Sequence, residues 1–542
     1  MPDRRQALAV LSSTLLLPLG AHFARAREAE PLPRAHEAEP RRGGTLTLVE
    51  VGEPTTLVPL TDSNTRTRNL STKVTEGLLR FDADFAPQPL LATAWSVSQD
   101  GLRYRFTLRP NVRWHDGKLF TAADVRFSLL ALKRIGPRGR ITFANLVEVE
   151  TPDPLTAILV LSKPTPYLLK ALTAAESPIV PAHAYPNNAY PDASYGDSPN
   201  GSAPIGTGPY IFVEWARGSH LVLRRNPDYW QPGRPFLDRI VVRFVADTMA
   251  VSTALEAGEA DVSYSVALPE LERLRGHPRL AVTTASDDYL NNAQVLEFNL
   301  DRPVLARRDV RHALAAAIDR RIITGTIFYG HAQAAGSTIP ASLKAYNHEA
   351  SFAHPFDLAR ANRLLDEAGL PRGPDGTRFP LRLTFIPGPT FKKTAEYLRA
   401  ALSRIGVKVD LVDGDLATFI RRVYTERDFD LNLNGISRLF DPTAGVQRLY
   451  WSDGIKHPLP YLNAAHYDNP AVDDFFRQAA TEVDEARRRE IFRQIQVIVG
   501  ADLPALALVT IPTITVQNAR VRRLVNSIDL TAGDFSETWL AP

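Results

Sequence analysis

The chain has 542 residues, more than a single hydrophobic core usually serves, so we expect at least two lobes. Its 63 basic and 60 acidic residues leave a formal net charge of only +3, which gives no electrostatic reason to expect nucleic acid as a partner. The absence of cysteine excludes disulfides, thiolate metal sites, thiol nucleophiles and a lipid-modified N-terminal cysteine.

Residues 1–26 have the pattern of an export signal peptide. Arg4-Arg5 gives a basic start, an apolar run of about 14 residues follows, and Ala24-Arg25-Ala26 is a typical cleavage site. The arginine pair is similar to a twin-arginine signal, but Ala7 stands where that signal usually has Phe, so both the general secretory and the twin-arginine routes stay open. We expect a mature protein free in a Gram-negative periplasm, with a disordered leader over residues 27–44.

Ordered structure is predicted to begin with a strand at residues 45–49 and an extended loop that ends near residue 64. The clearest local pattern then covers residues 101–129. Alternating apolar and polar side chains at 103–109 predict a strand with one buried face. Turns follow, and Thr121 with Asp124 three residues later predicts a capped helix start.

This order of parts resembles the signature of the family 5 bacterial extracellular solute-binding proteins, the dipeptide, oligopeptide and nickel receptors of ABC importers. The matching segments are residues 101–104, 106–109, 112–117 and 120–125, with further matches at 204–210, 225–230 and 310–314. The resemblance implies an α/β fold of the periplasmic binding protein type (class II, cluster C). Such a fold is a clam-shell of two lobes with an extra subdomain in the first lobe.

The predicted elements and the resemblance together give a division of the chain. Lobe 1 is expected over residues 45–284 with its extra subdomain at about 76–204, lobe 2 over 285–503, and a C-terminal return to lobe 1 over 504–542. Helices and strands alternate over residues 357–434. This alternation is typical of βαβ units and predicts a mostly parallel sheet in lobe 2.

No group of residues has the pattern of a catalytic site. The sequence contains neither G-x-S-x-G nor H-E-x-x-H, and we expect no enzyme activity, no cofactor and no resident metal. Gly206 and Gly208 lack the third glycine and the following helix of a dinucleotide-binding loop, so we interpret them as allowing a tight turn between subdomains. Of the twelve histidines, His457 and His466 lie nearest the presumed ligand cleft.

The resemblance places the main ligand segment at residues 437–451. Peptide receptors of the family commonly have there an Asp that pairs with the ligand's ammonium group, a few residues before an Asp-Pro pair. Here the Asp-Pro is present, but an arginine stands in the preceding stretch, which favours an anionic ligand. The predicted contacts in this stretch are Ser437, Arg438, Phe440 and Asp441. The alternative is that Arg438 faces solvent or pairs with Asp441.

Five further residues are predicted ligand contacts, each with a structural alternative. Tyr450 and Trp451 would line the pocket or pack in the core. Ser63 and Asn64 would give polar contacts across the cleft or form an exposed turn. Asn299, at the end of the first strand of lobe 2, would donate a hydrogen bond either to the ligand or to the hinge between the lobes.

The sequence therefore predicts a periplasmic receptor of an ABC importer that captures peptides or similar small solutes. The alternative ligand is a nickel chelate, an opine or another anionic compound. We expect a monomer that closes on its ligand and then docks on an inner-membrane permease with ATPase subunits. A secreted hydrolase is a third hypothesis, disfavoured because the sequence has no triad or metal motif.

Overall fold

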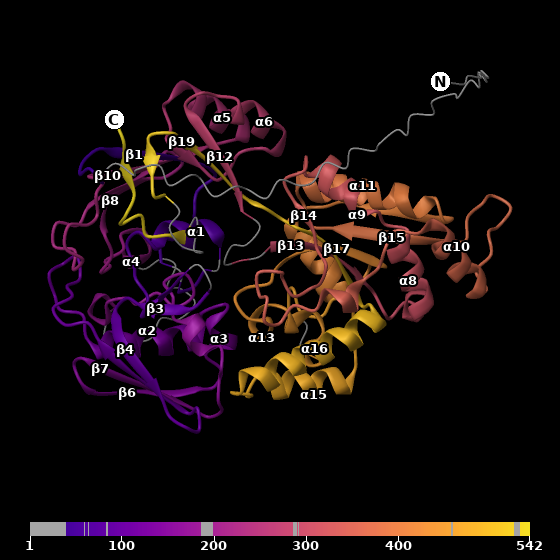
Figure 1. The fold of residues 1–542 in the computed structure, drawn as a ribbon, viewed down its shortest axis with the longest axis horizontal. Helices are drawn as coiled ribbons and strands as arrows, with labels where there is room; N and C mark the ends of the chain where they lie inside the picture. The colour runs from indigo at the N-terminus through magenta and orange to yellow at the C-terminus, as the bar shows by residue number, and fades with distance from the viewer. Residues whose placement is uncertain are drawn as a thin grey trace, which may run out of the picture. The chain divides into compact units, whose positions relative to one another are not determined.

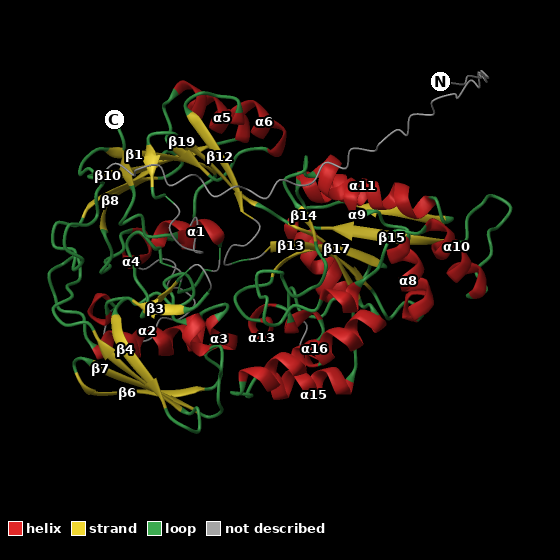
Figure 2. Ribbon diagram, viewed as in Figure 1, coloured by secondary structure: helices red, strands yellow, loops and turns green. Residues whose placement is uncertain are grey.

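The computed structural model of the chain describes residues 39–542, except residues 59, 63, 83–84, 186–198, 286–289, 291, 457–458 and 525–531. The described residues form separate β-sheets with helices packed on them (Figures 1 and 2). Among these residues, no helix combines the length and the hydropathy that a membrane-spanning segment needs.

The largest sheet has seven strands in the order β12-β19-β11-β1-β10-β9-β8 and forms the core of the first lobe. The strands are β1 (Thr45–Val51), β8 (Tyr210–Ala216), β9 (His220–Arg225), β10 (Arg239–Val245), β11 (Val262–Ser263), β12 (Leu280–Ala285) and β19 (Thr513–Asn518). Strand β1 lies between its parallel partners β10 and β11. Helices α5 (Thr248–Ala257) and α6 (Leu271–Arg275) pack beside these strands through a shared apolar cluster (Figure 1).

A four-stranded antiparallel sheet, β4-β5-β7-β6, forms the subdomain that contains the signature stretch. Its elements are β4 (Ala92–Val97), β5 (Arg103–Leu108), α2 (Ala122–Ile135), α3 (Gly139–Thr142), β6 (Leu146–Asp153) and β7 (Thr156–Leu161). The alternation in β5 is confirmed, because its residues are buried and exposed in turn. The capping box of α2 is also confirmed, since both Thr121–Asp124 contacts are present.

Short elements complete the first lobe. They are α1 (Thr65–Ser71), β2 (Leu79–Phe81), β3 (Pro87–Pro89), α4 (Pro199–Ser202), β20 (Val521–Arg522) and β21 (Trp539–Leu540), with 3₁₀ turns at Leu168–Ala171, Ala182–Ala184 and Leu268–Glu270.

The second lobe is built on a six-stranded sheet in the order β14-β18-β13-β17-β15-β16. Its strands are β13 (Asn292–Phe298), β14 (Gln333–Ala334), β15 (Phe379–Phe385), β16 (Val407–Val412), β17 (Leu431–Ser437) and β18 (Ala505–Thr510). Only β15 pairs in parallel, with β16 and with β17, while the other neighbouring pairs are antiparallel. The prediction of a mostly parallel sheet is therefore wrong. The βαβ units supply one side of the sheet, and strands from distant parts of the chain supply the other.

Helices cover both faces of this sheet. The helices of the second lobe are α7 (Pro303–Ala306), α8 (Arg308–Ala316), α9 (Arg320–Ile322), α10 (Leu358–Glu367), α11 (Pro389–Ser403), α12 (Leu416–Ile420), α13 (Pro442–Gly445), α14 (Asp453–Lys456), α15 (Pro470–Ala479) and α16 (Glu485–Asp502), with 3₁₀ turns at Glu349–Phe352 and Gln447–Leu449 and π turns at Ile323–Ile327 and Arg421–Glu426. Helices α8, α10 and α11 share one apolar cluster with the sheet, and α15 and α16 share another (Figure 1).

The chain passes between the two large sheets twice. Strand β12 ends at Ala285 and β13 begins at Asn292, so the first passage between the sheets lies between these two residues. The return was predicted from residue 504, but the apolar strand β18 pairs with β13 and completes the second sheet. The return therefore lies between Thr510 and the start of β19, where Ile511 N donates to Asn292 O at 2.8 Å. The other lobe boundaries stay predictions.

Gly206 sits where two segments of the first lobe approach closely. A Cβ atom at this position would lie 1.8 Å from the carbonyl oxygen of Val74. The same turn accepts a hydrogen bond from His115 N at Gly206 O, at 2.9 Å, and His115 belongs to the signature stretch. The glycine is thus required by the close approach of the backbone, and it joins the signature stretch to the seven-stranded part of the lobe.

We predict that Gly206→Ala lowers the free energy of unfolding by about 1–3 kcal/mol, because the methyl group forces the Val74 backbone away. Gly325→Ala is the matched control, since a Cβ atom there meets nothing within 4 Å. Urea unfolding of both variants measures the difference. Equal stability of the two variants would contradict the close approach.

Candidate functional site

The Asp-Pro pair of the predicted ligand segment is a structural anchor. The Asp441 carboxylate is fully buried and accepts two hydrogen bonds from Arg488 of α16, at 2.7 and 2.8 Å. It also caps α13 by accepting a hydrogen bond from Thr443 N at 2.9 Å. Burial raises the pKa of Asp441, but the charge and hydrogen bonds of Arg488 outweigh it and hold the pKa below its usual value. The structure thus places Asp441 in a bidentate ion pair inside lobe 2, which differs from the predicted role of ligand contact.

Arg438 takes neither of the alternatives considered from the sequence. Its side chain is 1% exposed, so it does not face solvent, and the ion-pair partner of Asp441 is Arg488. The Arg438 guanidinium donates to Thr510 Oγ1 at 2.8 Å and lies 3.5 Å from Ser337 O. Because Thr510 ends β18, Arg438 fastens the predicted ligand segment to the start of the return crossing.

Most of the remaining predicted aromatic and hydroxyl contacts pack inside the protein. Phe440 is buried and lies 6.4 Å from the ring of Phe81 in the first lobe, so it belongs to the apolar contact between lobes. Tyr450 is 1% exposed, and its hydroxyl donates to Thr338 Oγ1 at 3.0 Å. Trp451 packs edge-on against Phe476, at 6.5 Å between ring centroids. Ser437 donates to Asn292 Oδ1 at 2.8 Å, where the first crossing ends.

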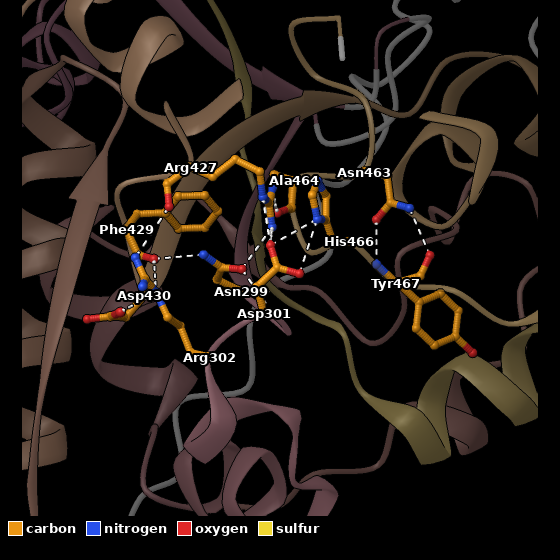
Figure 3. A network of polar contacts seen from close by, with 10 residues as sticks. All are labelled: Asn299, Asp301, Arg302, Arg427, Phe429, Asp430, Asn463, Ala464, His466 and Tyr467. Carbon is orange, nitrogen blue, oxygen red and sulfur yellow. Dashed lines mark hydrogen bonds and ion pairs between the residues drawn. The ribbon is translucent and has the colours of Figure 1, made fainter. Parts of the chain in front are cut away.

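Asn299 belongs to a polar network at the end of β13 opposite the crossings (Figure 3). Its side-chain amide donates to Phe429 O at 2.8 Å, and its oxygen accepts from Arg427 at 2.8 Å. His466, one of the two histidines singled out from the sequence, contacts the Asp301 carboxylate through Nδ1, at 2.9 Å from Oδ2, in the same network. The network fixes the loop around Arg427, so the predicted ligand or hinge role of Asn299 is not what its contacts show. His457 lies outside the described residues.

The loop of the first lobe that precedes α1 contains the predicted contacts Ser63 and Asn64. Asn64 is exposed and caps α1 by accepting a hydrogen bond from Arg66 N, while Ser63 lies outside the described residues. Asp62 instead lines a small cavity of about 20 Å³ together with Arg68, Arg138 and Glu176.

An arginine cluster in the first lobe surrounds this small cavity. Glu176 is buried and forms ion pairs with both Arg68, at 3.6 Å, and Arg138. A single carboxylate therefore serves two guanidinium groups. With Asp62 also at the cavity, this part of the first lobe is close to neutral before any charge of the second lobe is added.

Arg448 of the second lobe is a third guanidinium, and its charge interacts with that of Arg138. Its Nη2 donates to Ser437 O at 3.1 Å, and its buried Nε has no hydrogen-bond partner among the described residues. Burial, and next the like charge of Arg138, lower the pKa of Arg448 to about 10. Because Arg138 belongs to the first lobe, this repulsion acts between charges of the two lobes. Within the described part of the chain, Arg448 forms no ion pair with a carboxylate.

Glu297 is the carboxylate of lobe 2 whose charge affects the pKa of Arg448. It is 2% exposed and accepts hydrogen bonds from Asn432 and Asn434 at 2.8 and 3.2 Å. Burial raises the pKa of Glu297 to about 7, against the lowering effect of Asn434 and Arg448. At neutral pH this group is therefore only partly ionised, and it does not fully compensate Arg448.

The arrangement is suited to holding an anion. An anionic group between Arg448 and Arg138 would replace their mutual repulsion by two favourable interactions. Among the described residues, no group of three or more His, Cys, Asp or Glu side chains has the geometry of a metal site. Sequence reasoning missed Arg448, although it lies inside the predicted segment, because nothing in the local pattern distinguishes it from Arg438.

Comparison with known proteins places this geometry in a family. Residues 86–457 match the model of the bacterial extracellular solute-binding proteins, family 5. The glutathione-binding protein GsiB of Pectobacterium atrosepticum is 26% identical over 477 residues, which cover 84% of this chain and 86% of the relative.

Two solved structures show the same fold. The ABC transporter substrate-binding protein CtaP from Listeria monocytogenes is similar with a TM-score of 0.81 and 24% identity, covering 93% of this chain and 100% of that chain. AgaA from A. tumefaciens R10, in complex with agropinic acid, is similar with a TM-score of 0.74 and 26% identity, covering 92% and 99%. The predicted two-lobed α/β clam-shell is thereby confirmed.

We predict that Arg488→Gln lowers the free energy of unfolding by about 3–5 kcal/mol, because Asp441 then keeps a buried, uncompensated charge. The neighbouring Arg489 forms an exposed pair with Glu485, so Arg489→Gln should stay within the ~0–1 kcal/mol typical of surface pairs. Denaturant unfolding measures the free energy of unfolding of both variants. A similar decrease in the two would show that the buried Asp441–Arg488 pair does not anchor the segment around Asp441.

Proposed function

The chain belongs to the family 5 bacterial extracellular solute-binding proteins of ABC importers. We propose that its solute is a peptide or a similar small compound, and that the protein binds this solute through the solute's carboxylate group. The solute would be bound between the lobes without covalent chemistry, so the protein is a receptor and not an enzyme. Hinge closure would then report occupancy to the transporter.

The observation that carries this proposal is the charge of Arg448. A guanidinium that is largely buried, has no ion-pair partner among the described carboxylates and is repelled by the charge of a second arginine is costly in the absence of an anion. A carboxylate matches the planar donor fork of arginine and compensates both charges at once. The preference for an anionic ligand, which the sequence attributed to Arg438, is thus attributed to Arg448 and Arg138.

The relatives support a carboxylate-bearing solute. GsiB is named for glutathione, and AgaA was solved with agropinic acid, two compounds that both carry carboxylates. Glutathione represents the peptide class and agropinic acid the opine class. The same arginine pair keeps the opine or other anionic ligand as an alternative, because arginine binds a carboxylate group whichever compound carries it.

The family also gives the expected setting of the protein. We propose that it is exported to the periplasm, acts there as a monomer and delivers its solute to an inner-membrane permease with ATPase subunits. The signal pattern of residues 1–26 supports export, and those residues lie outside the described part of the chain.

A thermal-shift screen of the mature chain tests the proposal with dipeptides, glutathione, agropinic acid, nickel-histidine and uncharged amide analogues. A solute that binds only the folded state raises the melting temperature according to its affinity and concentration. We predict that carboxylate-bearing solutes stabilise the protein and that their amide analogues do not.

Arg448→Gln should then weaken the best solute by about 2–5 kcal/mol, because one partner of a desolvated charge pair is removed. Arg477→Gln, at an exposed pair with Asp474, is the matched control and should leave the affinity unchanged. Binding of amides as strong as that of the acids, or conversion of a solute into products, would contradict the proposed function.

A further inference from the structure

A cavity of about 410 Å³ in the second lobe has a basic lining. It lies where α8 and α10 meet the last turns of α16 and the 3₁₀ turn Glu349–Phe352 (Figure 1). The other lining residues are uncharged or neutral, and the basic ones are His312, His348, His354 and Arg360. Because no carboxylate is among the lining residues, the cavity favours an anionic occupant.

The wall of the cavity is built by tight tertiary contacts. A Cβ atom on Gly500 of α16 would lie 2.0 Å from Ser351 O, so the 3₁₀ turn packs directly on the helix backbone. His348 N donates to Gln496 Oε1 at 3.0 Å, and His348 Nδ1 lies 2.7 Å from Ser351 Oγ. These contacts fix the turn on α16 and hold the shape of the cavity.

Arg360 brings an uncompensated positive charge to the cavity. It is half-buried, and none of the described carboxylates lies within ion-pair distance of its guanidinium group. Asp357, the nearest acidic residue along the chain, accepts a hydrogen bond from the backbone N of Arg360 at 2.9 Å and caps α10. The guanidinium fork of Arg360 is therefore available to an anion.

His354 is an independent sign of a missing ligand. Its Nε2 atom is buried and has no hydrogen-bond partner in the described part of the chain, and its ring lies 5.1 Å from that of His312. Burial lowers the pKa of His354 to about 4, and the charges of His312, Arg320 and Arg360 act in the same direction. All three of these charges are positive, so an anion in the cavity would relieve the repulsion.

His312 links the occupancy of the cavity to protons. Its Nε2 lies 2.8 Å from Ala501 O, and because a carbonyl oxygen only accepts, Nε2 carries the hydrogen. A neutral imidazole carries one proton, so Nδ1 of His312 donates a hydrogen bond only when the ring is protonated. An anion that bonds to this ring therefore takes up a proton.

We propose that this cavity is a second binding site of the protein, and that Arg360, His312 and His354 hold an oxyanion group in it, either an inorganic oxyanion or a carboxylate. A metal ion fits less well, because no three of the described His, Cys, Asp or Glu side chains form a group that could hold one.

The cavity is separate from the proposed solute site. Neither Arg448 nor Arg138 lines it. Helix α16 binds Asp441 through Arg488, near its start, whereas the cavity lies at residues 497–501, near its end. The inference therefore does not depend on the proposed function, and its failure would leave that function untouched.

The bound oxyanion should bind more tightly as the pH falls, because it favours the protonated forms of His312 and His354. Arginine side chains keep their charge over the range that matters. The charged or titratable groups on the surrounding elements are His312 of α8, Arg320 of α9, Asp357 and Arg360 at the start of α10, His348 and Glu349 at the 3₁₀ turn, His354 after it, and Glu490 of α16, whose charge interacts with that of His348.

Sulfate is the probe that tests the site, because its charge stays constant between pH 6 and pH 8. We predict that sulfate raises the melting temperature of the mature chain in a saturable way, more at pH 6 than at pH 8, while sodium chloride at equal ionic strength does not. Arg360→Gln should abolish the saturable shift. Arg363→Gln, at an exposed position of the same helix outside the cavity, is the matched control and should keep it.

Titration calorimetry in two buffers of different ionisation enthalpy measures the proton uptake, and His354→Gln should reduce this uptake if Arg360→Gln does not fold. Citrate in place of sulfate distinguishes a carboxylate from an inorganic oxyanion as the better occupant. No saturable shift, an equal loss of the shift in Arg360→Gln and Arg363→Gln, or stabilisation by zinc without stabilisation by either anion would overturn the inference.

Discussion

The bidentate ion pair between Asp441 and Arg488 fixes the part of the second lobe on which the site depends. It ties the start of α13 to α16 and leaves the preceding residues, Leu439 and Phe440, in the apolar contact with the first lobe. Gly445 passes so close to Arg438 O that a Cβ atom would lie 1.8 Å away. The segment is thus held in one tight turn, and Arg448 follows from that turn with its guanidinium beside Ser437 O.

Charge is distributed unevenly around this fixed segment. The Asp441–Arg488 pair balances the interior of lobe 2. In contrast, Arg68 and Arg138 of the first lobe share Glu176, and Arg448 of the second lobe has no ion pair with a described carboxylate. In the proposed mechanism, closing the lobes without a solute would be opposed by the repulsion between Arg448 and Arg138. A bound carboxylate would turn that repulsion into attraction, so solute binding and closure would be coupled by one electrostatic interaction.

Local patterns predicted the local structure well. The alternation in β5 and the Thr121–Asp124 capping box depend on residues close in sequence, and the structure confirms them. Strand direction in the second sheet was not predictable in this way, because β13 and β18 pair across more than two hundred residues. The surroundings of the predicted site residues were not predictable for the same reason. Asp441 and Arg488 are 47 residues apart, and only the fold distinguishes Arg438, which binds Thr510, from Arg448.

We propose that one carboxylate of the solute bridges Arg138 of the first lobe and Arg448 of the second. A double-mutant cycle on solute affinity, with Arg138→Gln, Arg448→Gln and the double variant, tests this bridge. We predict a coupling energy of about 1 kcal/mol or more, because both side chains act on the same group. Strictly additive losses, or no loss at Arg138, would contradict it.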